Sequence, residues 1–212
     1  MEHEATWIQW GVVLGFLALF FAFIFWQARR VRRKWHALGD RLGFEVKAHP
    51  HFFGDHTLVG SYAGVPTVLA LFERGSGKNR KQFTAIEMAA AEAPKGLYVK
   101  VSREGIGDWI AKKFGGQDVQ VGDEAFDRAF RIQASDETLC RELLDPVTRQ
   151  ALLEAEKFGQ LHVDGHVVQY VVSGYRFKPE FFEAAMPFVA QVSGNLSRLP
   201  GATVPPPEEP LA

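Results

Sequence analysis

The hydrophobic pattern of the chain begins with an apolar run from Trp7 to Trp26, WIQWGVVLGFLALFFAFIFW, in which Gln9 is the only strongly polar residue. As an α-helix, a run of this length extends about 30 Å, which matches the hydrocarbon core of a bilayer. Tryptophans stand at both ends of the run, where indole rings prefer the headgroup level. We therefore predict a transmembrane helix over residues 7–26.

Basic residues follow the apolar run at once: Arg29, Arg30, Arg32, Arg33 and Lys34. The stub before the run, residues 1–6, contains Glu2 and Glu4 but no Lys or Arg. A cleaved signal peptide has the opposite arrangement, with basic residues before a shorter apolar core. Because positive charge marks the cytoplasmic side, we predict a single-pass protein of the inner (cytoplasmic) membrane with its N-terminus outside. The five basic residues are then candidates for contact with anionic lipid headgroups.

Small residues form a stripe at helical spacing inside the predicted span: Gly11, Gly15, Ala18 and Ala22. Such stripes allow two membrane helices to approach closely, which predicts a homodimer through this face. Gly and Ala are also common in membrane helices, so a chance pattern is the alternative.

Beyond the anchor, the charge balance changes sign. Residues 1–34 carry five Lys/Arg and two Glu, whereas the rest carries 19 Lys/Arg and 23 Asp/Glu. A mildly acidic domain argues against nucleic acid as a partner. The lone Cys140 excludes an intrachain disulfide and fits a reducing compartment. We divide the chain into a stub (1–6), a transmembrane helix (7–26), a basic juxtamembrane helix (27–42), a cytoplasmic α+β domain (43–200) and a disordered Pro-rich tail (201–212).

Short apolar or alternating runs after Gly43 predict strands, with Ala63 and Gly64 as a hairpin turn. The predicted strands are 44–47, 58–62, 65–72, 82–91, 97–101 and 130–134. Residues 161–172 predict a further hairpin with Asp164 and Gly165 as its turn. That turn would place Val163 opposite His166, and His162 opposite Val167.

Capping signals predict the helices of the domain. Ser135 would cap a helix through Leu144, and Asp145 with Pro146 begins another. The second helix would direct inward Val147, Ala151, Leu152, Ala155 and Phe158. Pro179 begins a C-terminal amphipathic helix that Pro187 should kink or split. The fold class is therefore α+β, with an antiparallel sheet packed against helices, and a pleckstrin-homology-like barrel is the alternative.

One stretch resembles a family of uncharacterised bacterial membrane-anchored proteins, a domain of unknown function. The resemblance lies mainly over residues 122–196 and rests on FDRAFRI (126–132), Ser135-Asp136 and LLDP (143–146). It implies an anchor followed by a cytoplasmic α+β domain. It brings no catalytic residues with it.

Few residues suggest chemistry. A loop with His49, His51, Asp55 and His56 could ligate a metal, but it lacks a recognised ligand spacing, so we predict no metal and no cofactor. The carboxylates of Asp123, Glu124 and Asp127 lack a calcium-loop pattern and are expected to form a solvated rim. Cys140 stands among leucines, which predicts a buried apolar role.

The segment from Gly75 to Lys78, GSGK, invites comparison with a phosphate-binding loop. Phe72 and Asn79 occupy positions where that motif needs Gly and Ser or Thr, so we reject it. The basic residues around it are Arg74, Lys78, Arg80 and Lys81. They are either solvated or in contact with anionic lipid.

These patterns favour a membrane-tethered interaction or scaffold domain that is not an enzyme. Its expected partners are membrane lipid and a protein. A lipid- or peptide-binding module at the inner leaflet is the alternative, and a metal-dependent enzyme is the third.

Overall fold

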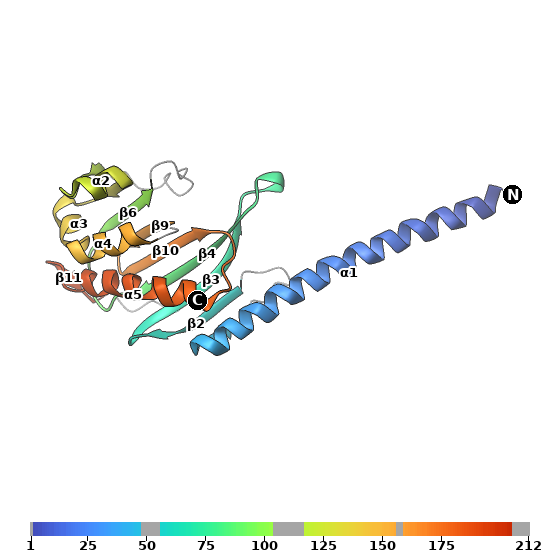
Figure 1. Cartoon of the computed structure of the whole chain (residues 1–212), viewed down its shortest axis with the longest axis horizontal. Helices are drawn as coiled ribbons and strands as arrows, with labels where there is room; N and C mark the ends of the chain where they lie inside the picture. The colour runs from blue at the N-terminus through green and yellow to red at the C-terminus, as the bar shows by residue number, and fades with distance from the viewer. Residues whose placement is uncertain (1, 48–55, 104–116, 156–158, 205–212) are drawn as a thin grey trace, which may run out of the picture.

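The computed structural model describes residues 2–47, 56–103, 117–155 and 159–204. Helix α1 (Glu2–Leu42) is a single helix of 41 residues that projects far from an α+β domain (Figure 1). Within Val13–Leu42 it is long and apolar enough to cross a membrane, with a mean hydropathy of 1.4 and no burial of its most apolar part. The predicted span and juxtamembrane helix are therefore parts of one continuous helix.

The end of α1 follows from local backbone chemistry. Gly43 has a φ of 72°, and the N–H of Phe44 donates to the carbonyl of Gly39 at 2.9 Å. This bond closes a Schellman motif, in which the residue after the helix must adopt a left-handed conformation that favours glycine. Gly43 is therefore the residue at which α1 ends.

A nine-stranded sheet forms the centre of the domain, in the order β1-β2-β3-β4-β10-β9-β6-β8-β7, and all its neighbouring strands are antiparallel. Its strands are β1 (Glu45–Lys47), β2 (His56–Tyr62), β3 (Val65–Arg74), β4 (Lys81–Ala89), β6 (Tyr98–Arg103), β7 (Gln117–Val119), β8 (Phe130–Ala134), β9 (Gln160–Asp164) and β10 (Val167–Ser173). The α+β prediction is confirmed. Because β1 and β7 are edges in the described sheet, it is open, and the barrel alternative is wrong.

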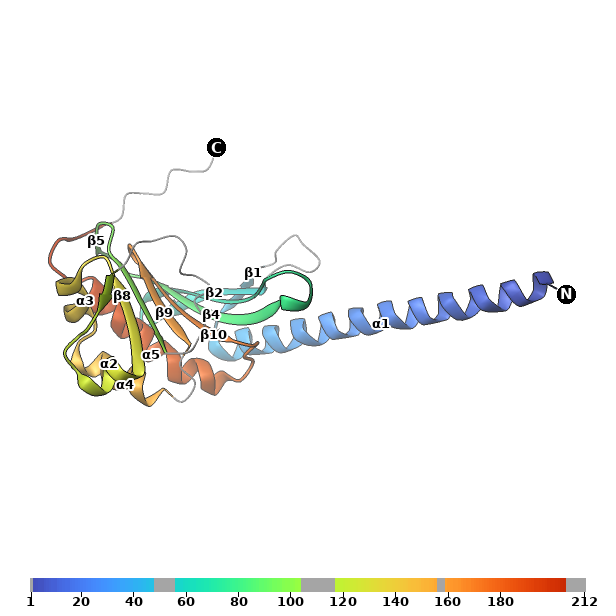
Figure 2. The same ribbon diagram turned by 90° about the horizontal axis from the view of Figure 1, so that it is seen from above.

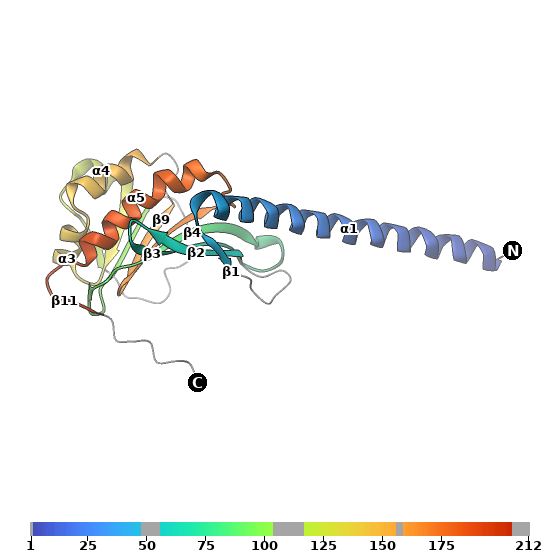
Figure 3. The ribbon, with the colours of Figure 1, turned by 90° about the horizontal axis from the view of Figure 1, so that it is seen from below.

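The helices of the domain lie on one face of the sheet (Figures 2 and 3). They are α2 (Glu124–Ala129), α3 (Glu137–Leu143), α4 (Pro146–Glu154) and α5 (Pro179–Leu196). The apolar stripe of α5 is buried: Phe182, Met186, Val189, Val192 and Leu196. Burial of such a stripe against apolar strands is the main source of stability for an amphipathic helix. Pro187 lies inside α5 without splitting it.

The register of the β9–β10 hairpin differs from the prediction. Val163 lies opposite Val168, and His162 lies opposite Gln169. Gly165 and His166 form the turn, one residue later than predicted. Gly165 has a φ of 55° at the first turn position, which is the glycine position of a type II′ turn. Asp164 therefore stays in the strand, paired with Val167.

Three further expectations need correction. Asp136, not Ser135, caps α3, because its carboxylate accepts from the N–H of Leu139 at 2.9 Å. Val147 is 62% exposed, whereas Thr148 and Leu152 point into the core. The predicted tail is partly ordered, because β11 (Ala202–Thr203) pairs with β5 (Ala93–Pro94).

Candidate functional site

The C-terminal part of α1 is built into the core of the domain. Trp35 is 0% exposed, and Leu38 is also buried. The Trp35 ring makes edge contacts with Phe177 and Phe182, at centroid distances of 6.3 and 6.2 Å. A Cβ added to Gly39 would lie 2.9 Å from a methyl group of Leu58, so the helix packs closely on β2. The domain therefore has a fixed attachment to the helix that carries the candidate membrane span.

The five predicted lipid contacts occupy the exposed stretch of α1 just before Trp35. These residues are Arg29, Arg30, Arg32, Arg33 and Lys34. Two of them lie over rings of the apolar run, Arg29 over Phe25 at 4.4 Å and Arg30 over Trp26 at 5.5 Å. Lys34 instead lies 5.4 Å from the ring of Phe177, in the domain. Such cation–π contacts hold the charges along the helix surface, and contact with lipid stays a prediction.

The small-residue stripe is open in the single chain. Gly15, Ala18 and Ala22 are exposed, and a Cβ on Gly15 would meet nothing within 4 Å. The side-chain surroundings of Gly11 lie outside the described part of the chain. Self-association through this stripe stays a prediction.

Only the last residue of the candidate metal-binding loop lies in the part of the chain that the structure describes. His49, His51 and Asp55 lie outside the described residues, and His56 begins β2. Across the described ranges, no group of three His, Cys, Asp or Glu is placed to hold a metal ion.

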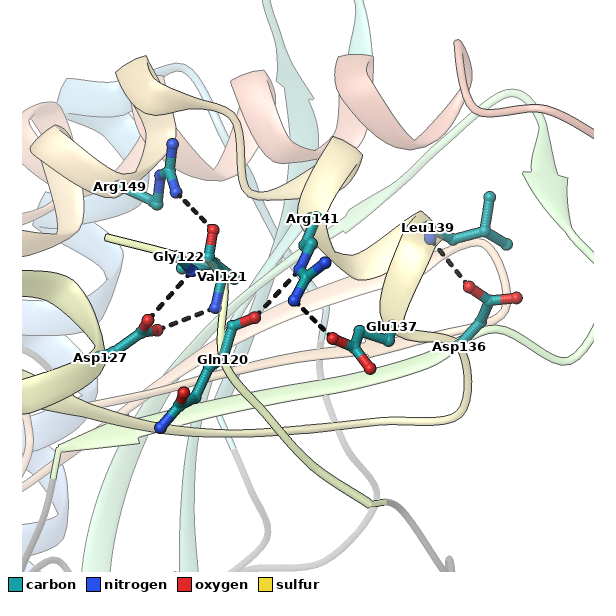
Figure 4. A network of polar contacts seen from close by, with 9 residues as sticks. All are labelled: Gln120, Val121, Gly122, Asp127, Asp136, Glu137, Leu139, Arg141 and Arg149. Atoms are coloured by element: carbon teal, nitrogen blue, oxygen red, sulfur yellow. Dashed lines mark hydrogen bonds and ion pairs between the residues drawn. The ribbon is translucent and has the colours of Figure 1, made fainter. Parts of the chain in front are cut away.

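Two members of the acidic cluster predicted to be a solvated rim stabilise local structure. Asp123 caps α2 by accepting from the N–H of Phe126. Asp127 accepts from the N–H groups of Val121 and Gly122, at 2.9 and 3.0 Å (Figure 4). Hydrogen bonds from backbone N–H groups to a carboxylate are charge-assisted and stronger than those between neutral groups. The solvated-rim interpretation is therefore wrong for Asp123 and Asp127.

Two arginines hold the carbonyl groups of the same loop (Figure 4). Arg149 donates from α4 to the carbonyl of Val121 at 3.2 Å, and Arg141 donates from α3 to that of Gln120 at 3.0 Å. Together with Asp127, they tie α2, α3 and α4 to residues 120–122. Much of the 126–146 stretch that carries the family resemblance thus has a structural role.

Cys140 has the predicted apolar role. Its side chain is fully buried, and burial, followed by the nearby Glu137, raises the pKa of the thiol to about 12. A thiol that stays protonated is a poor nucleophile.

A row of polar residues crosses the sheet face that points away from the helices. Strand register places six of them side by side on six strands, and we call this set the polar row: Glu87, Gln169, His162, Lys100, Gln133 and Asp118. Gln169 donates to Glu87 at 2.8 Å, and Gln133 donates to Asp118 at 3.4 Å. Lys100 is 1% exposed and His162 is 7% exposed.

The centre of the polar row is electrostatically unusual. Burial, followed by the positive charges of Lys100 and Arg74, lowers the pKa of His162 to about 4. Its ring is therefore neutral at pH 7 and lies 3.4 Å from the amide oxygen of Gln160. The row can exchange hydrogen bonds with polar groups, but its members spread along the sheet without converging on one point. Sequence reasoning missed it, although Gln160, His162 and Asp164 alternate with apolar residues.

Comparison with known proteins supports the fold. No family model and no curated protein matches the chain. Among solved structures, the crystal structure of the mycobacterial trehalose monomycolate transport factor A, TtfA, has a similar fold, with a TM-score of 0.58 and 11% sequence identity. The match covers 82% of this chain and 97% of that chain. At this identity the similarity shows the fold alone, and the resemblance to a bacterial membrane-anchored family stays a prediction.

Proposed function

We propose that this protein is a single-pass membrane protein whose α+β domain is a tethered interaction module, presented to partner proteins on the cytoplasmic side. The observation that carries the proposal is the burial of Trp35 and Leu38 in the domain core, on the same unbroken helix as the apolar span. Trp35 follows Trp26 by nine residues. A helix rises by about 14 Å over that length, so the domain would stand directly beside the bilayer.

The rigid attachment favours an interaction role over simple tethering. A flexible linker would let a domain search a large volume, whereas a continuous helix holds one set of surfaces at one height above the membrane. TtfA is described as a transport factor. The shared fold is compatible with such a factor, and the apolar span of this chain would place its work at a membrane.

Co-purification tests the proposal. The full-length protein would be isolated in mild detergent, and bound proteins identified by mass spectrometry. A variant with residues 7–26 replaced by an unrelated apolar helix of equal length is the matched control. We expect a reproducible partner that survives this replacement but is lost when residues 43–204 are deleted. A preparation without any such partner, or a partner that follows the apolar span, would contradict the proposal.

A further inference from the structure

The tip of the β3–β4 hairpin is strongly basic, although the domain as a whole is acidic. Four basic residues, which we call the basic hairpin, surround the short helix η1 (Gly77–Asn79): Arg74, Lys78, Arg80 and Lys81. All four are exposed. One carboxylate, Glu73, offsets them in the segment 73–81, through an ion pair with Arg80 at 3.2 Å. A net positive tip remains.

The hairpin projects toward the side of the candidate membrane. In all three views its tip extends from the domain on the side from which α1 leaves toward its N-terminus (Figures 1, 2 and 3). Helix α4 lies at the opposite end of the domain in the same views. Because Trp35 fixes the domain on α1, this direction is a property of the fold and does not depend on a flexible joint.

The charge and the position of the hairpin fit one partner. The cytoplasmic leaflet is anionic, and each Lys or Arg near its surface strengthens association by about fivefold. The attraction falls off over about 10 Å, so it acts only on groups held close to the headgroups. The exposed basic residues of α1 directly follow the apolar span, so they lie at the expected level of the headgroups.

We propose that the basic hairpin is a second membrane contact, which binds anionic phospholipid headgroups beside the anchor and sets the tilt of the domain. The inference rests on the proposed function, because it requires α1 to span the bilayer. With two separated contacts, the domain would have one face turned to the membrane. Its far end, with α2, α3 and α4, would face the cytoplasm.

Fluorescence quenching in nanodiscs tests this contact with the full-length chain. A fluorophore would be placed by Ser76→Cys, since Ser76 is exposed and its side chain makes no capping bond. The buried Cys140 leaves the new thiol as the labelling site. Val147→Cys, at an exposed position of α4, provides the matched far-end label. The nanodiscs would contain headgroup nitroxide lipid in neutral phosphatidylcholine, with or without about one-third phosphatidylglycerol.

We expect the label at residue 76 to be quenched in anionic nanodiscs and the label at residue 147 to remain bright. Changing Lys78, Arg80 and Lys81 to Gln removes three charges, which should weaken the contact by on the order of a hundredfold and abolish the quenching. Changing Lys95, Arg128 and Arg198 to Gln removes the same charge elsewhere and should leave the quenching intact.

Three outcomes would overturn the inference, and those against the hairpin contact can be told apart from the one against the anchor. Equal quenching at residues 76 and 147, or equal quenching in neutral and anionic nanodiscs, would overturn the hairpin contact alone. A chain that does not co-elute with lipid at all would overturn the membrane anchor, and the hairpin contact would fail with it.

Discussion

The imidazole of His162 has a pKa of about 4 instead of 6.5, because it is buried in the sheet near Lys100 and Arg74. Between these pH values the unfolded chain binds a proton that the folded chain does not. The contribution of His162 to the free energy of unfolding is therefore fully present above pH 6.5. It is lost as the pH falls from 6.5 toward 4, which lowers the free energy of unfolding by up to about 3 kcal/mol.

His162→Gln should remove this part of the pH dependence, because glutamine does not titrate. Urea unfolding at about pH 7 and about pH 4.5 would measure it, with wild type losing more stability on acidification than the variant. His166→Gln, in the adjacent turn, is the control. Equal losses in wild type and His162→Gln would contradict the buried, neutral histidine.

The polar row shows where single residues escape sequence reasoning. Alternation in Gln160–Asp164 indicates that His162 shares a face with Gln160, but it does not show whether that face is wet or buried. Lys100 lies beside His162 only because β6 pairs with β9, and that pairing joins segments about sixty residues apart in the chain. The capping residue of α3 was harder still, because Ser135 and Asp136 are both good caps.

At the scale of elements, the joint between α1 and the domain depends on Trp35. Trp35→Ala removes a fully buried ring and should lower the free energy of unfolding by about 3–5 kcal/mol. Trp26→Ala, on the exposed part of the same helix, should change it by less than about 0.5 kcal/mol. Chemical unfolding of both variants in detergent would show the difference, and similar losses would argue against the joint.

The side-chain hydrogen bonds that Asp127, Arg141 and Arg149 make to residues 120–122, which we call the clamp, give a second prediction at this scale. Asp127→Ala leaves the N–H groups of Val121 and Gly122 without their acceptor, which should cost about 1–3 kcal/mol. Hydrogen exchange of these two amides should quicken accordingly. Glu124→Gln, which changes only an exposed ion pair with Arg128, should leave both exchange rates unchanged. Slow exchange in Asp127→Ala would refute the clamp.

Most elements were predictable because their signals are local. Gly43 ends α1, Asp145 and Pro146 begin α4, and the Ala63–Gly64 turn joins β2 to β3. The order of the strands was not predictable, because β4 pairs with β10 although the two strands are about eighty residues apart in the chain, and any two apolar strands satisfy the same pattern. The prediction of the β9–β10 register was wrong by one turn position because Asp-Gly and Gly-His both suit a two-residue turn.

At the scale of the whole molecule, the sequence indicates an orientation that cell labelling can test. Val204 is exposed, so a cysteine there can react with a maleimide. Because the domain is predicted to be cytoplasmic, a membrane-impermeant maleimide should label this cysteine only after cells are permeabilised. Changing Arg29, Arg30, Arg32, Arg33 and Lys34 to Gln removes the charge asymmetry. Part of the population should then insert in the opposite orientation and be labelled in intact cells. Labelling of Val204→Cys in intact cells would place the domain outside.

Because α1 is unbroken, a change in the number of residues between the apolar span and the domain would both rotate the domain and change its distance from the span. One residue inserted between Trp26 and Trp35 would rotate the domain by about 100° about the helix axis and lift it by about 1.5 Å. Seven inserted residues would return nearly the same face at a height about 10 Å greater. In the proposed arrangement, the length of this short stretch therefore sets two things for a neighbouring membrane protein: which side of the domain it meets, and how far above the bilayer it meets it.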